Sequence, residues 1–426
     1  MFKLSRRGFA LASLAAVLSP STAMSALLPN GDGDHSSLLR GALAIAAARG
    51  EGLALGAGSF KCANLSLPSG TAITGVPGRT FLEAIGSAPI FIIEDATAIS
   101  LHGLTFSSTL RAGNLVKALR VKGLAVDACR FYGAARGLEL EACAGRIANC
   151  DFSQQEQGAL FSIDATGLRV TDNTVSDMAN NGIQVWRSLA GEDGTIITGN
   201  RIERIAARDG GTGQNGNGIS VFRAGNVVVA NNRVTDCAFS AIRCNSGSGI
   251  QIIGNSVARC EEVALYAEFD FRGALISGNI VEDSAFGISI ANYDVDGRLA
   301  VCNGNVIRNL RQGTGDPTAQ VGGIHCEADT MVSNNVIENA RDFGIRLGWG
   351  KCRNLTATAN LVRGTRHGIE VSAAEGATSI MVANNVITAE TAIIAMDHQN
   401  PASGDLLNSA SEIPAHVFLS GNRVGT

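Results

Sequence analysis

Ten asparagines recur along the chain in nearly the same local sequence, and this repeat restricts the possible folds more than any other feature. They are Asn173, Asn200, Asn232, Asn255, Asn279, Asn305, Asn335, Asn360, Asn385 and Asn422. Their spacing runs from 23 to 37 residues, with most values near 25. A repeat this short, below the length of most helical repeats, indicates a chain built from one small unit used many times.

A second pattern, Gly-Ile-x-Val or a close variant, occurs in eight of these units. It lies at 182–185, 218–221, 241–244, 264–267, 287–290, 323–326, 344–347 and 368–371. Its apolar residues alternate with a period of two, which is typical of a strand, and a third apolar stretch such as 227–229 precedes each asparagine. Strands separated by only a few residues cannot pair with one another and must stack on the next unit. The sequence therefore predicts an all-β fold, a single-stranded parallel β-helix (β-solenoid) of about 13 coils with three short strands each.

The repeated asparagines are expected to be structural. Asparagine tolerates the unusual backbone angles of a tight turn. At equivalent turns of neighbouring coils the side chains would lie about 4.8 Å apart, the spacing of adjacent strands, and would hydrogen-bond to one another. The composition agrees with a long solenoid, because glycine is abundant, with 51 residues, and only 5% of residues are aromatic.

Residues 1–25 are predicted to be an export signal and not part of the fold. The stretch 5–9, Ser-Arg-Arg-Gly-Phe, matches the twin-arginine motif, and the apolar stretch 9–18 is too short to span a bilayer. Removal of the signal changes the formal net charge from −4 to −7, which disfavours nucleic acid as a partner. We expect a periplasmic or secreted bacterial protein that meets the twin-arginine translocase during export and has no membrane span in its mature chain.

The mature chain is predicted to have two parts. Residues 26–58 form an N-terminal cap with a short helix that begins at Ser36 and ends at Gly50, and residues 59–426 form the β-helix. Such a cap covers the apolar end and the unpaired edge of the first coil. No cap is evident after Asn422, which raises the hypothesis of self-association at that end.

All ten cysteines lie in the mature chain, and several follow the coils. Cys129 and Cys150 take the position of the asparagine, while Cys237 and Cys260 each lie five residues after it. Neighbouring coils could bring either pair within disulfide range. Because folding precedes twin-arginine export from a reducing compartment, we expect buried thiols. The chain has no Cys/His spacing of the kind that binds zinc.

These features resemble a known group of proteins. The helix followed by strands, and the Gly-Asn-x-Ile coils, are similar to right-handed parallel β-helix proteins of the pectate-lyase-like superfamily. With the motif at 5–9, the chain also resembles a family of twin-arginine-translocated repeat proteins of uncharacterised activity. The resemblance covers nearly the whole chain and implies a right-handed coil. It implies no single activity, because the fold carries lyases, epimerases, hydrolases and non-catalytic fibres or adhesins.

Strand alternation also predicts which side chains of the Gly-Ile-x-Val sheet point outward to solvent. One outward column is Gln184, Ser220, Arg243, Tyr266, Ser289, His325, Arg346 and Glu370, and the second contains Trp186, Phe222, Asn245, Glu268 and Glu327. Aromatic rings stack on sugar faces and arginines pair with uronate carboxylates. The candidate substrate-binding residues are therefore Trp186, Phe222, Arg243, Glu327 and Arg346. The alternative is an ordinary solvated sheet.

The richest cluster of reactive side chains lies at 264–329. Tyr266 and His325 share a column two coils apart, about 10 Å at the backbone, so a sugar ring could lie between them. One could take the proton α to a uronate carboxylate while the other donates a proton, as a lyase or an epimerase requires. Arg243 and Arg346, on either side, would stabilise the developing negative charge.

Acidic residues of the same cluster offer other chemistry. Glu268 or Asp270 opposite Asp294 or Asp296 could form the carboxylate pair of a glycoside hydrolase. The same acids could hold Ca²⁺, although an acidic turn explains 294–297 better. The export route also permits a cofactor that is loaded before export. The Asp-Pro-His motif of alginate epimerases and the Gly-His-Gly motif of polygalacturonases are both absent.

The sequence alone therefore predicts an exported β-helix protein that contacts carbohydrate. We expect a polysaccharide lyase, epimerase or hydrolase acting on an acidic glycan. The alternative is a non-catalytic polysaccharide-binding or structural β-solenoid. Insertions at 210–218, 312–321 and 397–414 could wall a groove, or they could be tolerated decoration.

Overall fold

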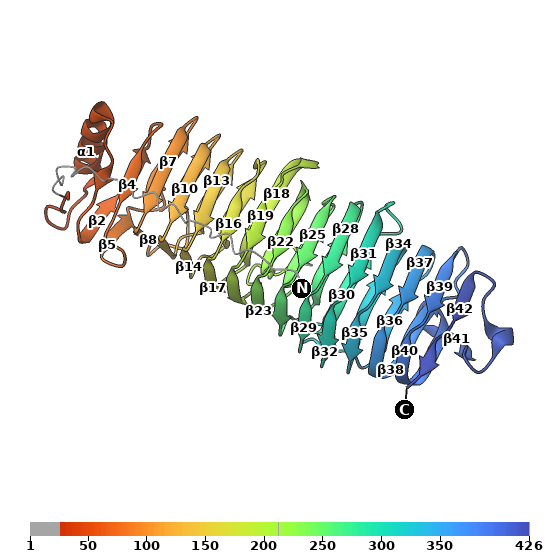
Figure 1. Ribbon diagram of the computed structural model, residues 1–426. Helices are drawn as coiled ribbons and strands as arrows, with labels where there is room; N and C mark the ends of the chain where they lie inside the picture. The colour runs from red at the N-terminus through yellow and green to blue at the C-terminus, as the bar shows by residue number, and fades with distance from the viewer. Residues whose placement is uncertain (1–25, 212, 426) are drawn as a thin grey trace, which may run out of the picture.

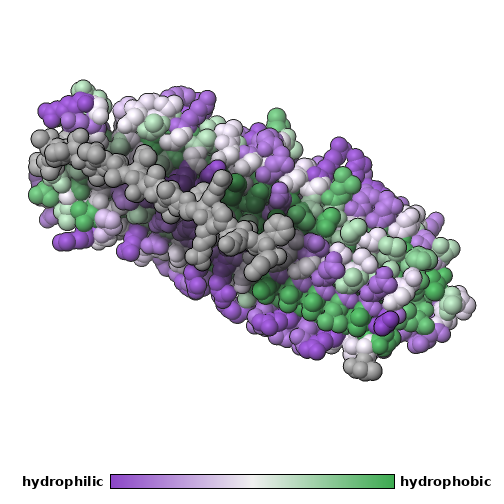
Figure 2. Space-filling view, viewed as in Figure 1, coloured by the Kyte–Doolittle hydropathy of each residue, from purple (hydrophilic) through white to green (hydrophobic). Residues whose placement is uncertain are grey.

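The chain winds into one elongated parallel solenoid (Figure 1, Figure 2). The computed structural model describes residues 26–211 and 213–425, so the predicted twin-arginine signal at 1–25 lies outside the described residues. Helix α1 (Ser36–Arg49) lies at the N-terminal end, and about 14 coils follow in chain order toward the C-terminus. The predicted all-β parallel solenoid, with a helix near its N-terminus, is confirmed.

Each coil contributes strands to three ladders, which we call sheets 1, 2 and 3. Sheet 1 precedes the asparagine turn and consists of β1 (Leu53–Ala54), β4 (Ala72–Thr74), β7 (Thr97–His102), β10 (Lys122–Asp127), β13 (Ala144–Ala148), β16 (Arg169–Thr171), β19 (Ile196–Thr198), β22 (Val228–Ala230), β25 (Ile250–Ile253), β28 (Arg272–Ser277), β31 (Arg298–Asn303), β34 (Ala328–Ser333), β37 (Arg353–Thr358), β39 (Ile380–Ala383) and β42 (Val417–Ser420). Sheet 2 follows the turn and consists of β2 (Gly58–Cys62), β5 (Thr80–Ala84), β8 (Thr105–Ser107), β11 (Arg130–Tyr132), β14 (Asp151–Ser153), β17 (Thr174–Met178), β20 (Arg201–Ile205), β23 (Arg233–Cys237), β26 (Ser256–Ala258), β29 (Ile280–Glu282), β32 (Val306–Arg308), β35 (Val336–Glu338), the first parts of β38 (Leu361–Ser372) and β40 (Val386–Asp397), and β43 (Arg423–Val424). Sheet 3 carries the Gly-Ile-x-Val pattern and consists of β3 (Leu65–Ser66), β6 (Phe91–Glu94), β9 (Asn114–Leu119), β12 (Arg136–Glu141), β15 (Gly158–Ile163), β18 (Asn181–Glu192), β21 (Ile219–Gly225), β24 (Ile242–Asn245), β27 (Val263–Glu268), β30 (Phe286–Ala291), β33 (Gly322–Cys326), β36 (Phe343–Leu347) and the second parts of β38 and β40.

The asparagines form the predicted ladder. The backbone N–H and the side-chain Nδ2 of Asn255 donate to Oδ1 of Asn279 at 2.9 and 3.0 Å, and the same pattern runs from Asn173 to Asn422. The expected unusual backbone angle lies one position earlier, for example at Gly254 with φ 65°. This left-handed residue turns the chain, and the next residue, the asparagine, is buried between the coils.

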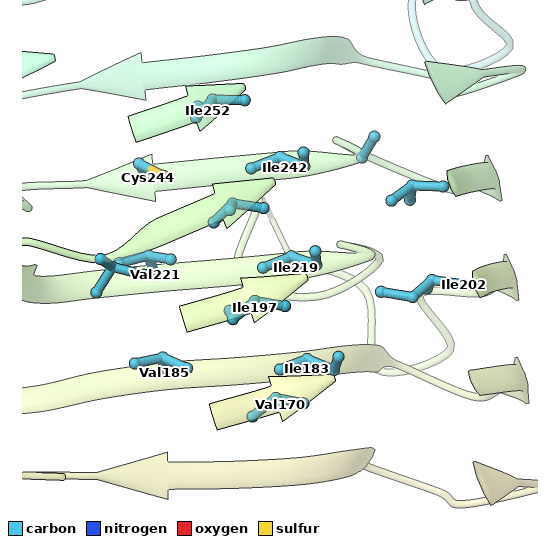
Figure 3. Packing of buried hydrophobic residues seen from close by; sticks show 14 of the residues in the cluster. Val170, Ile183, Val185, Ile197, Ile202, Ile219, Val221, Ile242, Cys244 and Ile252 are labelled. Carbon is cyan, nitrogen blue, oxygen red and sulfur yellow. The ribbon is translucent and has the colours of Figure 1, made fainter. Parts of the chain in front are cut away.

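Apolar side chains from all three sheets fill the inside of the coil (Figure 3). Val170, Ile183 and Ile202 come from sheets 1, 3 and 2 respectively, and all three are buried. Ala241 and Ala264 replace the glycine of the Gly-Ile-x-Val pattern in two coils, whereas at other coils close backbone contact requires glycine. A Cβ on Gly182 would lie 2.2 Å from the carbonyl oxygen of Gly218, and a Cβ on Gly287 would lie as close to that of Gly323. The pattern is therefore a packing requirement.

Helix α1 packs its apolar face against the first coils. Leu39, Leu43 and Ala46 are buried and join the core. The helix ends as predicted at Gly50, whose φ of 64° is the left-handed angle common at helix C-termini. In the described part of the chain no helix is long and apolar enough to cross a membrane.

The C-terminal end also has a cover, contrary to the expectation from the sequence. Strand β41 (Asn400–Asp405) pairs antiparallel with the end of β40 and occupies an edge that would otherwise be open. The 3₁₀ turn η1 (Ala410–Glu412) follows, and Leu406 is buried in the core. The predicted insertion at 397–414 is therefore a cap. It covers a strand edge that would otherwise be open to pairing with another chain.

All ten cysteines are buried and unpaired, as predicted. Cys150 extends the asparagine ladder, since its N–H donates to Oδ1 of Asn173 at 3.0 Å. Burial raises the pKa of the Cys62 thiol to about 12, so it is inert as a nucleophile.

Candidate functional site

The predicted columns of sheet 3 are in register. Tyr266 pairs with Ser289 and Ser289 with His325, so Tyr266 and His325 lie two coils apart in one column. Arg243 precedes this pair in the column and Arg346 follows it. The sequence therefore assigned the neighbours along this sheet correctly.

The outward side chains of sheet 3 were expected to be exposed to solvent, and for several of them this expectation is wrong. Glu268 and Arg346 keep only 3% and 4% of their surface exposed, and Gln184, Ser220 and Glu370 are also buried. Side chains of successive coils are only about 4.8 Å apart and cover one another. Insertions between the coils cover them further. The outward face of sheet 3 is a layer of packed polar side chains.

Arg243 is the centre of one polar network. Its Nε and Nη2 donate to the two carboxylate oxygens of Glu268 at 2.7 and 3.0 Å, and Asn245 donates to the same carboxylate at 2.9 Å. Glu262 lies 3.5 Å from Nη1 of the arginine. The guanidinium carbon lies 5.1 Å from the centre of the Tyr266 ring. Arg243 is thus already paired with carboxylates of this chain.

Arg346 is the centre of a second network. Its Nε donates to Glu370 at 2.5 Å, and Nδ1 of His367 lies 2.7 Å from the same carboxylate. Its guanidinium lies over the rings of Phe343 and Trp349, at 4.0 and 5.0 Å from their centres. This arginine is buried, paired and stacked on two aromatic rings.

Tyr266 and His325 have pKa values that burial moves in opposite directions. Burial, with a contribution from the nearby Glu268, raises the pKa of the Tyr266 phenol. Burial, with the positive charge of Arg346, lowers the pKa of His325 to about 3. At neutral pH the phenol therefore keeps its proton and the imidazole is uncharged.

Glu327 lies beside His325, with 3.7 Å between a carboxylate oxygen and Nε2. The other carboxylate oxygen accepts hydrogen bonds from the backbone N–H groups of Asn292 and Tyr293 at 2.8 and 3.0 Å. Burial raises the pKa of Glu327, so a charged pair with His325 is not favoured. His325 Nε2 is buried without a hydrogen-bond partner among the described residues.

The remaining predicted acids do not converge. Asp270 and Asp294 are exposed, whereas Glu268 is held by Arg243. Asp296 pairs with two arginines, Arg298 and Arg353, at 3.2 and 2.9 Å. The described structure therefore gives no support to a hydrolase pair between these acids.

An aromatic groove lies over the middle of sheet 3, and its volume is about 410 Å³. We define it by its lining residues, which are Trp186, Gly213, Gln214, Ser220, Phe222, Arg243, Asn245 and Phe269. One wall comes from the predicted insertion at 210–218, through Gly213 and Gln214. Hydrogen bonds from Asn180 to Asp209 and from Asn181 to Asn215 hold this region in place. The insertion thus walls a groove, one of the two roles that the sequence left open.

Sequence reasoning missed several residues of this region. The ring of Phe161 lies 5.4 Å from that of Trp186, which lies 5.4 Å from that of Phe222. Phe161 stands one coil before the first Gly-Ile-x-Val unit, so only the register reveals it. Phe269 follows a strand end, and no pattern marks it as a groove residue.

A second pocket of about 410 Å³ lies beside the insertion at 312–321 and is lined by Phe239, Val263 and Phe286 together with Glu262. Arg311, just before this insertion, pairs with Glu261. Burial raises the pKa of Glu262, which accepts a hydrogen bond from Ser240 at 2.8 Å. No sequence pattern predicts this pocket, because its walls come from different coils.

Two family descriptions match parts of the chain. The family described as "Periplasmic copper-binding protein (NosD)" matches residues 107–268, and the family described as "Right handed beta helix region" matches residues 188–350. Each match covers less than half of the chain and shows similarity, not membership. The predicted right-handed parallel β-helix is confirmed, while the resemblance to a twin-arginine-translocated family stays a prediction. No curated protein sequence matches the chain.

Solved structures with a similar fold differ widely in their roles. A tailspike protein of E. coli bacteriophage HK620, in complex with a pentasaccharide, shares 11% identity at a TM-score of 0.56, over 93% of this chain and 76% of that chain. The surface adhesin PfbA of Streptococcus pneumoniae shares 13% identity at a TM-score of 0.53, over 89% and 95%. The catalytic unit of an α-1,3-glucanase from Streptomyces thermodiastaticus shares 12% identity at 0.51, over 93% and 68%. Identities this low show the fold alone.

The residues of the first matched segment do not fit a copper site. Segment 107–268 contains no histidine, and its six cysteines are all buried. Copper is held in proteins by imidazole, thiolate or thioether groups that converge on one point. Within 26–211 and 213–425, no three His, Cys, Asp or Glu side chains group so that they could hold a metal ion. The same finding argues against the Ca²⁺ site considered at Asp294 and Asp296.

Proposed function

We propose that the protein is exported to the periplasm and binds a glycan in the aromatic groove of sheet 3. The observation that carries this proposal is the pair of rings of Trp186 and Phe222, which line the walled groove with 5.4 Å between their centres. Aromatic rings offer broad apolar faces on which sugar rings stack. The tailspike with the same fold was solved with a pentasaccharide, which is in line with this role.

Unpaired polar atoms beside the rings support the proposal. Nε1 of Trp186 and Oε1 of Gln184 are buried and have no hydrogen-bond partner among the described residues. Buried polar atoms are normally hydrogen-bonded, so these two call for a partner from outside the chain. One of them is a donor and the other is an acceptor. Sugar hydroxyl groups both donate and accept and would satisfy both.

The charge of the groove favours a neutral glycan over the acidic one that the sequence predicts. Arg243 is paired with Glu268, and Arg346 is paired with Glu370. A uronate carboxylate would have to compete with a buried carboxylate for either arginine. We therefore infer that stacking and hydroxyl hydrogen bonds, more than charge, determine what binds.

Tryptophan fluorescence can test this proposal directly. The chain has two tryptophans, so Trp349→Phe leaves Trp186 as the only reporter. We expect a saturable change with some member of a panel of neutral and uronate oligosaccharides. Phe222→Ala should weaken that binding at least about tenfold. Phe418→Ala, on the exposed face of sheet 1, is the control and should bind as before. Equal binding by both variants, or no response to any sugar, would contradict the proposal.

A second candidate function is a lyase or an epimerase. It is favoured by Tyr266 and His325, which lie in one column with pKa values moved in opposite directions. Neutral His325 would take the proton α to the carboxylate, and protonated Tyr266 would donate one. The test is the ultraviolet absorbance of an unsaturated product, or epimerised product by NMR, from a panel of uronate polymers. His325→Gln should abolish turnover while Trp186 fluorescence still reports binding. If the protein binds a uronate polymer but forms no product from it, the enzymatic function is excluded and glycan binding alone remains.

The proposed export can be tested separately. Arg6→Lys together with Arg7→Lys should retain the protein in the cytoplasm, since the export machinery reads the arginine pair. Cell fractionation measures the result. Unchanged appearance of the double variant in the periplasm would exclude the twin-arginine route.

A further inference from the structure

Five coils of sheet 2 carry an exposed apolar stripe. Its members pair directly with one another across neighbouring strands and are Ile280, Val306, Val336, Leu361 and Val386. Each is 36% to 46% exposed. In Figure 2 an apolar band lies over this part of the surface. We call these five residues the apolar stripe.

The stripe begins and ends abruptly. Before it, the same column holds Arg201, Arg233 and Ser256, and after it the column continues with Arg423. Strand propensity alone would not confine apolar residues to five adjacent coils of one column. Runs of exposed apolar residues with a polar surround mark surfaces that another molecule covers.

A column of alternating charge runs beside the stripe. Two positions further along each strand lie Glu282, Arg308, Glu338 and Arg363, which also pair in register. The neighbouring charges form ion pairs within the chain, between Arg308 and Glu282 at 3.0 Å and between Arg363 and Glu338. The surface thus presents an apolar line and, parallel to it, the charge order negative, positive, negative, positive.

We propose that this surface is a dimer interface with a second copy of the same chain, in which the two solenoids run antiparallel. This surface lies on sheet 2, apart from the aromatic groove on sheet 3. A twofold axis that runs parallel to the strands, between β32 and β35, places apolar stripe on apolar stripe. It also places charge column on charge column, because the rotation reverses the order of the coils but not the position along each strand.

The charge order selects this register. In it, Glu282 faces Arg363 of the partner subunit, and Arg308 faces Glu338 of the partner subunit. All four contacts across the axis therefore join opposite charges. If the axis passed through β35 instead, Glu338 would face its own copy and Arg308 would face Arg363 of the partner subunit. A twofold axis parallel to the solenoid would reverse the position along each strand, so the charge columns would not face each other when the stripes do.

The stripe is short, which limits the strength of the dimer. Five strands span about 19 Å along the solenoid, given the usual strand spacing. Stable interfaces bury about 800 Å² per partner, and a strip of this length and three residues wide buries less. We therefore expect a dimer that forms in the micromolar range and depends on concentration.

Sedimentation velocity of the full protein over a range of concentrations tests the proposal. The weight-average mass should rise toward that of a dimer as the concentration rises. Val336→Arg should weaken the dimer at least about tenfold, because it buries a charge at the centre of the stripe. Met331→Arg is the matched control, since Met331 is 48% exposed in the same coil but on sheet 1, and it should dimerise normally. A monomer at all concentrations, or loss of the dimer in the control alone, would overturn the proposal.

A charge exchange tests the antiparallel register and does not depend on an apolar substitution. Arg308→Glu alone and Glu338→Arg alone should each dimerise poorly, because each creates like charges across the axis. A mixture of the two variants should recover the dimer, since opposite charges then face each other again. Failure of the mixture to associate, while the unaltered protein dimerises, would rule out this register. Circular dichroism of each variant checks that the fold is retained.

Discussion

The guanidinium of Arg243 donates two hydrogen bonds, of 2.7 and 3.0 Å, to the carboxylate of Glu268 in the next coil. Their side chains keep only 13% and 4% of their surface exposed. A bidentate pair satisfies both groups in this covered place, whereas either charge alone would be costly to bury. The pair fixes the polar end of the aromatic groove.

Substitution of Glu268 alone is expected to lower the free energy of unfolding more than substitution of both Arg243 and Glu268. Glu268→Leu leaves the arginine charge buried and should lower the free energy of unfolding by about 3 kcal/mol. The double variant Arg243→Met/Glu268→Leu should lose less, because no unpaired charge remains. Urea unfolding of the two single variants and the double variant measures the difference. A double variant less stable than both single variants would contradict this account.

The asparagine ladder predicts a graded effect along the solenoid. Asn279→Ala removes the acceptor of two Asn255 hydrogen bonds and the donor to the carbonyl of Ile252, all of them buried. We expect a loss of about 3 kcal/mol or more, since each unsatisfied buried group costs about 1 to 3 kcal/mol. Asn422→Ala, at the half-buried end of the ladder, should cost about 1 kcal/mol. Urea unfolding compares the two, and equal losses would count against the ladder.

Gly287, in the Gly-Ile-x-Val pattern, should not tolerate a side chain. A Cβ on Gly287 would lie 2.2 Å from a backbone oxygen of the next coil, so Gly287→Ala should destabilise the protein by several kcal/mol. Gly41, inside helix α1, has open space at its Cβ position. Gly41→Ala should therefore stabilise the protein by up to about 1 kcal/mol through helix propensity. Thermal unfolding distinguishes the two, and a destabilised Gly41→Ala variant would refute the comparison.

His325 predicts a pH dependence of stability. Its pKa is lowered to about 3 in the folded protein, whereas that of an exposed histidine is about 6.5. Between these values the unfolded chain binds more protons, so this contribution is complete above the higher value and is lost as pH falls toward the lower one. We expect a loss of about 2 kcal/mol between about pH 6.5 and pH 5. His325→Gln should lack this component in urea unfolding at the two pH values. The same pH slope in both proteins would show that His325 is not its source.

Much of the candidate site could be assigned from the sequence, because a parallel solenoid keeps a strict register. The positions of Arg243, Tyr266, His325 and Arg346 in one column follow from counting residues after each asparagine turn. Whether these side chains are already engaged in ion pairs within the chain could not be predicted. Glu370 was known to point outward, but its pairing with Arg346 depends on the length and direction of side chains from different coils.

The sequence by itself determined the solenoid and its inward and outward columns, since these depend on a pattern that repeats along the chain, and it also indicated the helix at the start and the buried thiols. Only the tertiary structure decided that outward residues such as Glu268 are buried, that Gly213 and Gln214 wall a groove and that β41 closes the C-terminal edge. These features arise from insertions and from contacts between coils. Insertions have no period, and contacts between coils depend on side chains that lie far apart in the chain.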